Sequence, residues 1–256
     1  MPSKPSTSGE GIRLNRFLAT CGLGSRRHCE QLVTGGRIEI NGKACLNLAT
    51  RVQPGDSVRF DGTLLQRARE TTMLLNKPKG YLCSRGDPDG RDTIYNLLPP
   101  AFHHLAHIGR LDLDSHGLIL LSNSGELSEY LSHPRHKIEK EYHVTLDQAF
   151  DHDHIERLIR GIRLEEGLAV AKSVTPLNKR RLSVILQQGY KRQIRNMFDA
   201  IGYRVKNLER IRIGNLVAPD LGDGQWKLLG PVEIKAAMML ENQPRKTKRN
   251  RSGKKI

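Results

Sequence analysis

The stretch HIGRLDLDSHGLILL, residues 107–121, carries more information about the fold than any other part of this chain. It ends in a short continuous apolar run, residues 118–121, which predicts a fully buried strand rather than a surface loop. Two aspartates, an arginine and a serine come directly before that run. Polar groups at the mouth of a buried strand cost free energy unless they are paired or used. The stretch therefore predicts a packed domain with a candidate functional segment at the start of one strand.

The charge of the chain points to a polyanionic partner. Its 256 residues include 42 Lys and Arg against 27 Asp and Glu, which gives a formal net charge of +15. Such an excess favours nucleic acid first and an anionic membrane surface second, because neutralised phosphates release their counterions. No apolar run is long enough for a transmembrane helix, and the N-terminus lacks the apolar core of a signal peptide. We therefore expect a cytoplasmic protein without a membrane partner.

Cysteine and histidine spacing gives no sign of a metal site. The four cysteines show no C-x-x-C pair, and the ten histidines include no H-E-x-x-H motif. We expect four reduced thiols and no bound metal.

Composition divides the chain into four parts. Residues 1–10 are rich in Pro, Ser and Gly and predict a disordered tail, and residues 236–256 predict a disordered basic tail. Between them, residues 11–70 hold a small module and a polar linker over residues 61–71, and residues 71–235 form a larger domain. The predicted fold class is α+β, with two short helices and small strands in the first part and a mainly antiparallel sheet in the second.

The small module has the pattern of two helices followed by a hairpin. Apolar residues spaced three and four apart over 14–21 predict a first helix, and Ser25 is placed to cap a second one. An alternating segment, residues 37–40, precedes an Asn41-Gly42 turn signal. Its basic residues form either an ordinary solvated face or a surface that grips phosphates. The candidates are Arg13, Arg16, Arg26, Arg27, Arg37 and Lys43.

Three segments of this module match a known RNA-binding domain. They are RLNRFLA at 13–19, SRR at 25–27 and GRIEING at 36–42. Together they resemble the alpha-L motif, a small domain shared by a protein of the small ribosomal subunit and many RNA-modifying enzymes. The resemblance implies RNA binding and no chemistry.

The larger domain mixes single helices with several strands. Strands are predicted at residues 73–76, 141–146 and 182–186, in addition to the run at 118–121. Helices are predicted around residues 127–131, 155–162 and 194–201. Strands outnumber helices and do not alternate with them regularly, which favours an antiparallel sheet.

Two aspartates in the opening stretch are the first candidates for chemistry. Asp112 and Asp114 project to the same face if the segment is extended, whereas a turn separates them. The bland alternative is that one aspartate pairs with Arg110 and the other caps a turn near Ser115.

Two distant side chains could complete a site with these aspartates. Arg195 lies beside the apolar stripe of its predicted helix and is a candidate counter-ion, and a local pair with Asp199 is the bland alternative. Tyr142 alternates with apolar residues, so core packing is its default role. These residues, taken singly, leave the function open.

Four motifs in order identify a family. NKPKG at 76–80, GRLD at 109–112, KEYHV at 140–144 and QIR at 193–195 resemble the RsuA/RluB-type ribosomal pseudouridine synthases, which carry the alpha-L domain at their N-terminus. The resemblance implies that Asp112 is the catalytic aspartate, that Tyr142 packs against the target base, and that Arg195 pairs with the aspartate.

The resemblance also implies a reaction and a partner. The reaction breaks the bond from ribose C1′ to N1 of uridine and makes a bond to C5, so no atom is gained and no redox change occurs. It therefore requires neither cofactor nor metal, but an ionised carboxylate and a flipped-out target base. Ribosomal RNA, in a subunit or its assembly intermediate, is the expected partner of a monomeric enzyme. Lys77, Arg110 and Arg192 extend the predicted RNA-binding surface.

The choice of RNA and the catalytic role have alternatives. The segments GEL at 125–127 and HPR at 133–135 favour large-subunit (23S) rRNA, while small-subunit (16S) rRNA and tRNA stay open as substrates. A non-catalytic RNA-binding ribosome-assembly factor is the competing class, but it would not need Asp112 and Arg195. Glycoside hydrolysis by the two aspartates is disfavoured, because a charge of +15 offers no reason to bind neutral sugars.

Overall fold

The computed structural model describes residues 11–238, which fall into two compact units. The first unit extends to Leu113 and also includes Ile119–Tyr130 and Asp223–Leu229. The second contains Asp114–Leu118, Leu131–Gly222 and the residues from Gly230 onward. The chain therefore passes between the units within residues 107–121.

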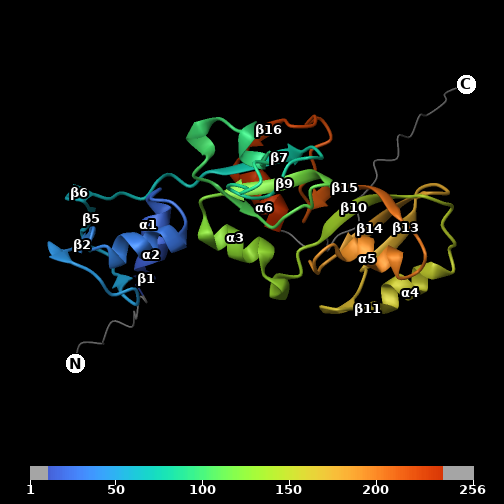
Figure 1. The fold of residues 1–256 in the computed structure, drawn as a ribbon, viewed down its shortest axis with the longest axis horizontal. Helices are drawn as coiled ribbons and strands as arrows, with labels where there is room; N and C mark the ends of the chain where they lie inside the picture. The colour runs from blue at the N-terminus through green and yellow to red at the C-terminus, as the bar shows by residue number, and fades with distance from the viewer. Residues whose placement is uncertain (1–10, 239–256) are drawn as a thin grey trace, which may run out of the picture. The chain divides into compact units, whose positions relative to one another are not determined.

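The first unit begins with the small α/β module, drawn in blue in Figure 1. Its core rests on Leu14, Leu18, Cys29, Val33 and Ile38, none of which is exposed. The strands β2, β3, β5 and β6 form an antiparallel sheet in the order β3-β2-β5-β6, and β1 pairs with β4. The elements are β1 (Ile12–Arg13), α1 (Leu14–Thr20), α2 (Arg26–Thr34), β2 (Ile38–Ile40), β3 (Lys43–Ala44), β4 (Arg51–Val52), β5 (Val58–Phe60) and β6 (Thr63–Leu64).

Local sequence signals explain this module well. The Ser25 hydroxyl accepts a hydrogen bond from the His28 backbone N–H at 3.2 Å, so the predicted cap of α2 is confirmed. Asn41 and Gly42 both have positive φ, 53° and 76°, as a tight turn between β2 and β3 requires. Short-range turn chemistry thus determines where these elements begin and end.

The remainder of the first unit surrounds a buried strand pair. The predicted run at 118–121 is confirmed as part of β9, where Ile119 and Leu121 are fully buried together with Met73 and Leu75 of β7. The strand β8 pairs antiparallel with β9, and β16 pairs antiparallel with β7. The bounds are β7 (Thr72–Lys77), β8 (Ala106–Ile108), β9 (His116–Ser122), α3 (Gly125–Ser132) and β16 (Trp226–Leu228), with short 3-10 helices at Ile94–Leu97 and Pro100–Phe102.

The second unit is an antiparallel sheet whose neighbouring strands lie in the order β13-β14-β10-β15. The last strand, β15, pairs in parallel with His116 and Gly117 at the start of β9. Its elements are a 3-10 helix (Pro134–His136), β10 (Lys140–Leu146), α4 (His154–Arg160), β11 (Ile162–Leu164), β12 (Gly167–Ala169), β13 (Ser173–Pro176), β14 (Arg181–Leu186), α5 (Gln193–Asp199), β15 (Val205–Ile213) and α6 (Pro231–Met238).

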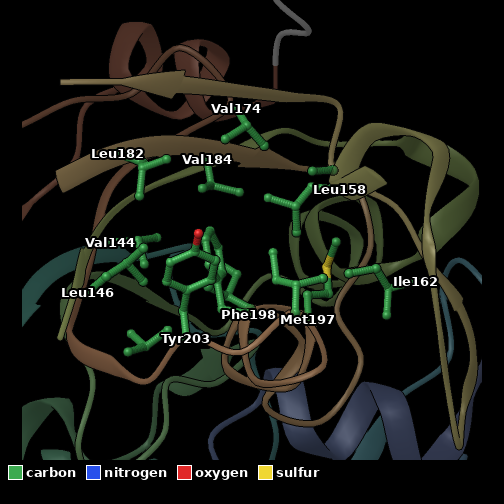
Figure 2. Packing of buried hydrophobic residues seen from close by; sticks show 14 of the residues in the cluster. Val144, Leu146, Leu158, Ile162, Val174, Leu182, Val184, Met197, Phe198 and Tyr203 are labelled. Atoms are coloured by element: carbon green, nitrogen blue, oxygen red, sulfur yellow. The ribbon is translucent and has the colours of Figure 1, made fainter. Parts of the chain in front are cut away.

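The core of this unit lies between the sheet and the helices α4 and α5. Figure 2 shows Phe198 of α5 and Tyr203 together beneath the strand residues Val184 and Leu182. The Phe198 and Tyr203 rings meet edge to face, with centroids 6.5 Å apart. Apolar residues at helical spacing in α5 and at alternate positions in β10 and β14 thus bury one continuous surface.

The predicted α+β class with a mainly antiparallel sheet is confirmed. Three boundaries were wrong. The predicted linker 61–71 contains the strand β6, and Ile162 starts β11 instead of ending α4, because Gly161 with φ of 110° stops the helix. The helix α6 continues through Met238, three residues past the predicted domain end at 235.

The predicted tails fall mostly outside the described residues. The first, 1–10, lies wholly outside, as does the part of 236–256 that follows residue 238. Within residues 11–238 no helix is long and apolar enough to cross a membrane. The four cysteines are free thiols, as expected.

Candidate active site

The backbone of the segment that carries Asp112 accepts hydrogen bonds at two consecutive residues. The Lys77 ammonium donates to the carbonyl oxygen of Asp112 at 3.1 Å and to that of Pro78 at 3.0 Å. The Gly80 N–H donates to the carbonyl oxygen of Leu113 at 2.8 Å. The NKPKG turn after β7 thus fixes the backbone of Asp112, while its side chain is only partly buried.

These contacts correct one prediction. Lys77 is fully buried, so its predicted role as a surface contact to RNA is wrong. A buried ammonium needs hydrogen-bond acceptors, and the turn and the Asp112 segment supply two carbonyl oxygens. Lys77 therefore orders the candidate catalytic segment.

The second aspartate of the opening stretch makes ion pairs with the helix α5. The carboxylate of Asp114 accepts two hydrogen bonds from the Arg192 guanidinium, each 3.3 Å long, and lies 3.2 Å from the Arg195 guanidinium. Partial burial alone would raise the pKa of Asp114, but the Arg192 hydrogen bond and the two guanidinium charges bring this pKa below its ordinary value. Asp114 is therefore a negative charge between two arginines, and not only a partner within its own turn.

Arg195 occupies a well-defined position. Its guanidinium donates to the carbonyl oxygens of Val205 at 2.9 Å and Asp114 at 3.1 Å, and to the Ser115 hydroxyl at 3.3 Å. Its side chain is only 12% exposed. These bonds fasten the helix α5 to residues 114–115, which come directly after the candidate catalytic segment.

Tyr142 lies on β10, half-buried, and packs against the core cluster of the second unit. Its register partner on β15 is Arg210, which is 3% exposed and donates to the carbonyl oxygen of Leu118 at 2.6 Å. The backbone of Arg210 also passes so close to Gly117 that a Cβ there would lie 2.3 Å from the Arg210 carbonyl oxygen. Arg210 thus supports both the strand of Tyr142 and the start of β9.

The three predicted catalytic residues fall in different units. Asp112 belongs to the first unit, and Tyr142 and Arg195 belong to the second. The pairing of Asp112 with Arg195 stays a prediction.

The predicted RNA-binding residues differ in whether they already form an ion pair with a carboxylate. Seven of the nine are exposed, and five of these seven form no ion pair within residues 11–238: Arg13, Arg26, Arg27, Lys43 and Arg110. Three make ion pairs within their own unit, Arg16 with Glu126 at 3.5 Å, Arg37 with Asp61, and Arg192 with Asp114. An exposed arginine that already has a carboxylate partner must exchange it to bind phosphate, so the first five are the readier contacts.

The sequence reasoning missed a set of buried charges in the second unit. Glu139 and Arg212 are almost fully buried, and Glu139 forms ion pairs with Arg212 at 3.6 Å and with Lys172. The alternation in ERIRI, residues 209–213, was a signal for a strand, but it did not indicate that the arginines would face inward. Among the described residues, no group of three or more potential metal ligands occurs.

Comparison of this chain with known proteins identifies first its class and then its family. Residues 12–58 match the model of the S4 domain, and residues 71–200 match the model of RNA pseudouridylate synthase. The chain is thus an enzyme with an N-terminal S4 domain. It belongs to the RNA pseudouridylate synthase family, whose members are isomerases.

Similar proteins cover nearly the whole chain. An uncharacterized RNA pseudouridine synthase of Aquifex aeolicus is 34% identical over 92% of this chain and 98% of its own length. The ribosomal large subunit pseudouridine synthase B of Bacillus subtilis is also 34% identical, over 87% of this chain and 94% of its own. A crystal structure of a pseudouridylate synthase superposes with a TM-score of 0.66 at 28% identity, covering 89% of this chain and all of that one. The predicted family and fold are confirmed.

Proposed function

We propose that this enzyme converts a specific uridine of large-subunit ribosomal RNA to pseudouridine, with Asp112 as its catalytic carboxylate. The observation that carries the proposal is the fixed segment around Asp112, in a chain that belongs to the pseudouridylate synthase family. The large-subunit substrate is supported by relatives that are named ribosomal large subunit pseudouridine synthase B, including those of Bacillus subtilis and Yersinia pestis.

The chemistry assigns a role to each of the three site residues. The carboxylate of Asp112 either attacks ribose C1′ or assists formation of a glycal while the bond from C1′ to N1 breaks. Arg195 orients this carboxylate and compensates its charge. The freed uracil must turn until C5 faces C1′ without leaving, and the ring of Tyr142 holds it by stacking. The bond from C1′ to C5 forms as the bond from C1′ to Asp112 breaks, or as C2′ of the glycal regains its proton. C5 then loses its proton, and N1 gains one directly or through solvent, which completes the isomerisation.

The target base must leave its stack before any of this occurs. Flipping costs a few kcal/mol, which contacts between basic side chains and the RNA backbone can offset. The S4 domain contributes such contacts through its exposed residues Arg13, Arg26, Arg27 and Lys43. We therefore assign the docking of RNA to this domain and the chemistry to the rest of the chain.

Replacement of Asp112 by asparagine tests the catalytic assignment. Asp112→Asn keeps the size of the side chain but removes its charge, so we expect no pseudouridine formation and an RNA dissociation constant within several-fold of wild type. A normal rate of pseudouridine formation by this variant would refute the assignment.

Mapping of pseudouridines tests the substrate. We expect one site, or a few sites, in large-subunit rRNA to lose its modification in cells that lack this gene, and to regain it when the gene is restored. Loss confined to small-subunit rRNA or tRNA would overturn the choice of substrate while leaving the reaction intact.

Charge reversal tests the docking role. Arg26→Glu combined with Arg27→Glu should weaken binding to intact rRNA, with a smaller effect on a short stem-loop that lacks the docking region. An equal loss on both RNAs would count against a pure docking role for the S4 domain.

A further inference from the structure

A pair of cations without an acidic partner flanks Tyr142. Lys140 and Tyr142 are two residues apart on β10, so their side chains lie on the same face of the sheet. Their register partners on β14 are the core residues Leu186 and Val184, which share that face. On the other neighbouring strand, Arg210 is the register partner of Tyr142. The stacking position of Tyr142 therefore has a lysine beside it along the strand and an arginine across from it.

Both cations are largely removed from water. Arg210 is 3% exposed, and one of its terminal guanidinium nitrogens is buried without a hydrogen-bond partner. Lys140 is half-buried, and its ammonium donates to the carbonyl oxygen of Ile138 at 3.2 Å. Burial, reinforced by the charge of Arg210, lowers the pKa of Lys140 to about 8.

The nearby carboxylates are engaged elsewhere. Glu139 pairs with Lys172 and Arg212, and Glu141 accepts hydrogen bonds from Arg212 and Ser183. Within residues 11–238 no carboxylate forms an ion pair with Lys140 or Arg210. An unpaired desolvated charge is unfavourable, so a fold that keeps two of them beside one aromatic ring indicates an anion that arrives from outside.

We propose that Lys140 and Arg210 form a site for an anionic oxygen of the substrate RNA beside the base held by Tyr142. This rests on the proposed function, because RNA is the anion that the enzyme must bind. A backbone phosphate next to the target nucleotide is the expected source, since it carries its charge in the ground state and Lys140 is partly open to solvent. The negative charge on the detached uracil is a second source of the same chemistry.

The affinity of the enzyme for RNA distinguishes a backbone phosphate from the detached uracil as the anion at this site. We would compare Lys140→Met with Lys140→Arg, each combined with Asp112→Asn, on an unmodified transcript of large-subunit rRNA between about 50 and 200 mM salt. For a phosphate contact we expect about tenfold weaker binding for the methionine variant and a salt slope lower by about 1, with the arginine variant close to the parent.

The rate of the reaction tests whether the detached uracil is the anion at this site. With active-site Asp112 intact, a lower single-turnover rate at saturating RNA and unchanged affinity for Lys140→Met would place the detached uracil at this site. Unchanged affinity, salt slope and rate together would overturn the proposal. The Asp112→Asn parent is assayed for pseudouridine formation in parallel, so failure of the catalytic assignment is distinguishable from failure of the Lys140 site.

Stability provides a matched control. Lys140→Met removes a desolvated charge that has no acidic partner, so its melting temperature should equal or exceed that of wild type. Lys172→Met removes the partner of buried Glu139 and should lower the melting temperature. If Lys140→Met lowered it as much as Lys172→Met does, Lys140 would have an internal partner and the proposal would be wrong.

Discussion

Gly117 provides the sharpest test of how the strand β9 is positioned. Its φ is 106°, and a Cβ built on it would lie 2.3 Å from the carbonyl oxygen and 2.6 Å from the nitrogen of Arg210. These are backbone atoms of a paired strand, so no side chain can move aside to relieve the contact. In Gly117→Ala the start of β9 must therefore shift by about 1 Å to reach an ordinary separation.

The expected cost has two parts. An L-residue at positive φ costs about 1–2 kcal/mol. Forced separation of two packed strands adds about 1–3 kcal/mol. We therefore expect Gly117→Ala to lower the free energy of unfolding by about 2–5 kcal/mol. Gly202→Ala is the matched control, because Gly202 has φ of 88° and nothing within 4 Å of its built Cβ, so only the first part applies.

The displacement should also affect catalysis. Asp114 and Ser115, which contact Arg195, come directly before β9 and would move with it. Misplacement by about 1 Å can cost about 100-fold in rate. Urea unfolding of both variants measures the first effect, and single-turnover pseudouridine formation measures the second. If Gly117→Ala matched Gly202→Ala in stability and kept the wild-type rate, the close approach of these strands would not matter as argued.

Three further predictions address other parts of the molecule. Asp114→Asn should slow single-turnover catalysis about 10- to 100-fold with little change in RNA affinity, because Arg195 loses a charged partner that orients it; equal activity of both proteins would contradict this role. Ser25→Ala should destabilise the protein by about 1 kcal/mol in urea unfolding, since the N–H of His28 loses its cap, while Ser25→Asp should restore most of the loss. The unfolded state holds more protons than the folded state between the lowered pKa of Lys140, about 8, and the ordinary lysine pKa of 10.5. The stability of wild type should therefore rise with pH across that window relative to Lys140→Met, and parallel stability curves for the two proteins would show that Lys140 is not desolvated.

The buried strand run and the capped helices were predictable because their signals are local. The apolar run at 118–121 and the Ser25 cap each depend on residues within one or two turns of chain. By contrast β15, the longest strand, was missed because its sequence VKNLERIRI carries four charges. Its arginines enter the interior only because Glu141, Glu139 and the carbonyl oxygen of Leu118 receive them.

The sequence by itself determined the family, the order of its motifs and the identity of the candidate catalytic residues, since these depend on residue types and their spacing. Tertiary structure alone decided that Lys77 is an internal support of Asp112, although it looks like a surface cation. It also decided that Asp114 joins two arginines from a helix about 80 residues away. The physical reason is that a charged side chain takes its role from the groups that remain near it when water is removed, and those groups come from distant parts of the chain.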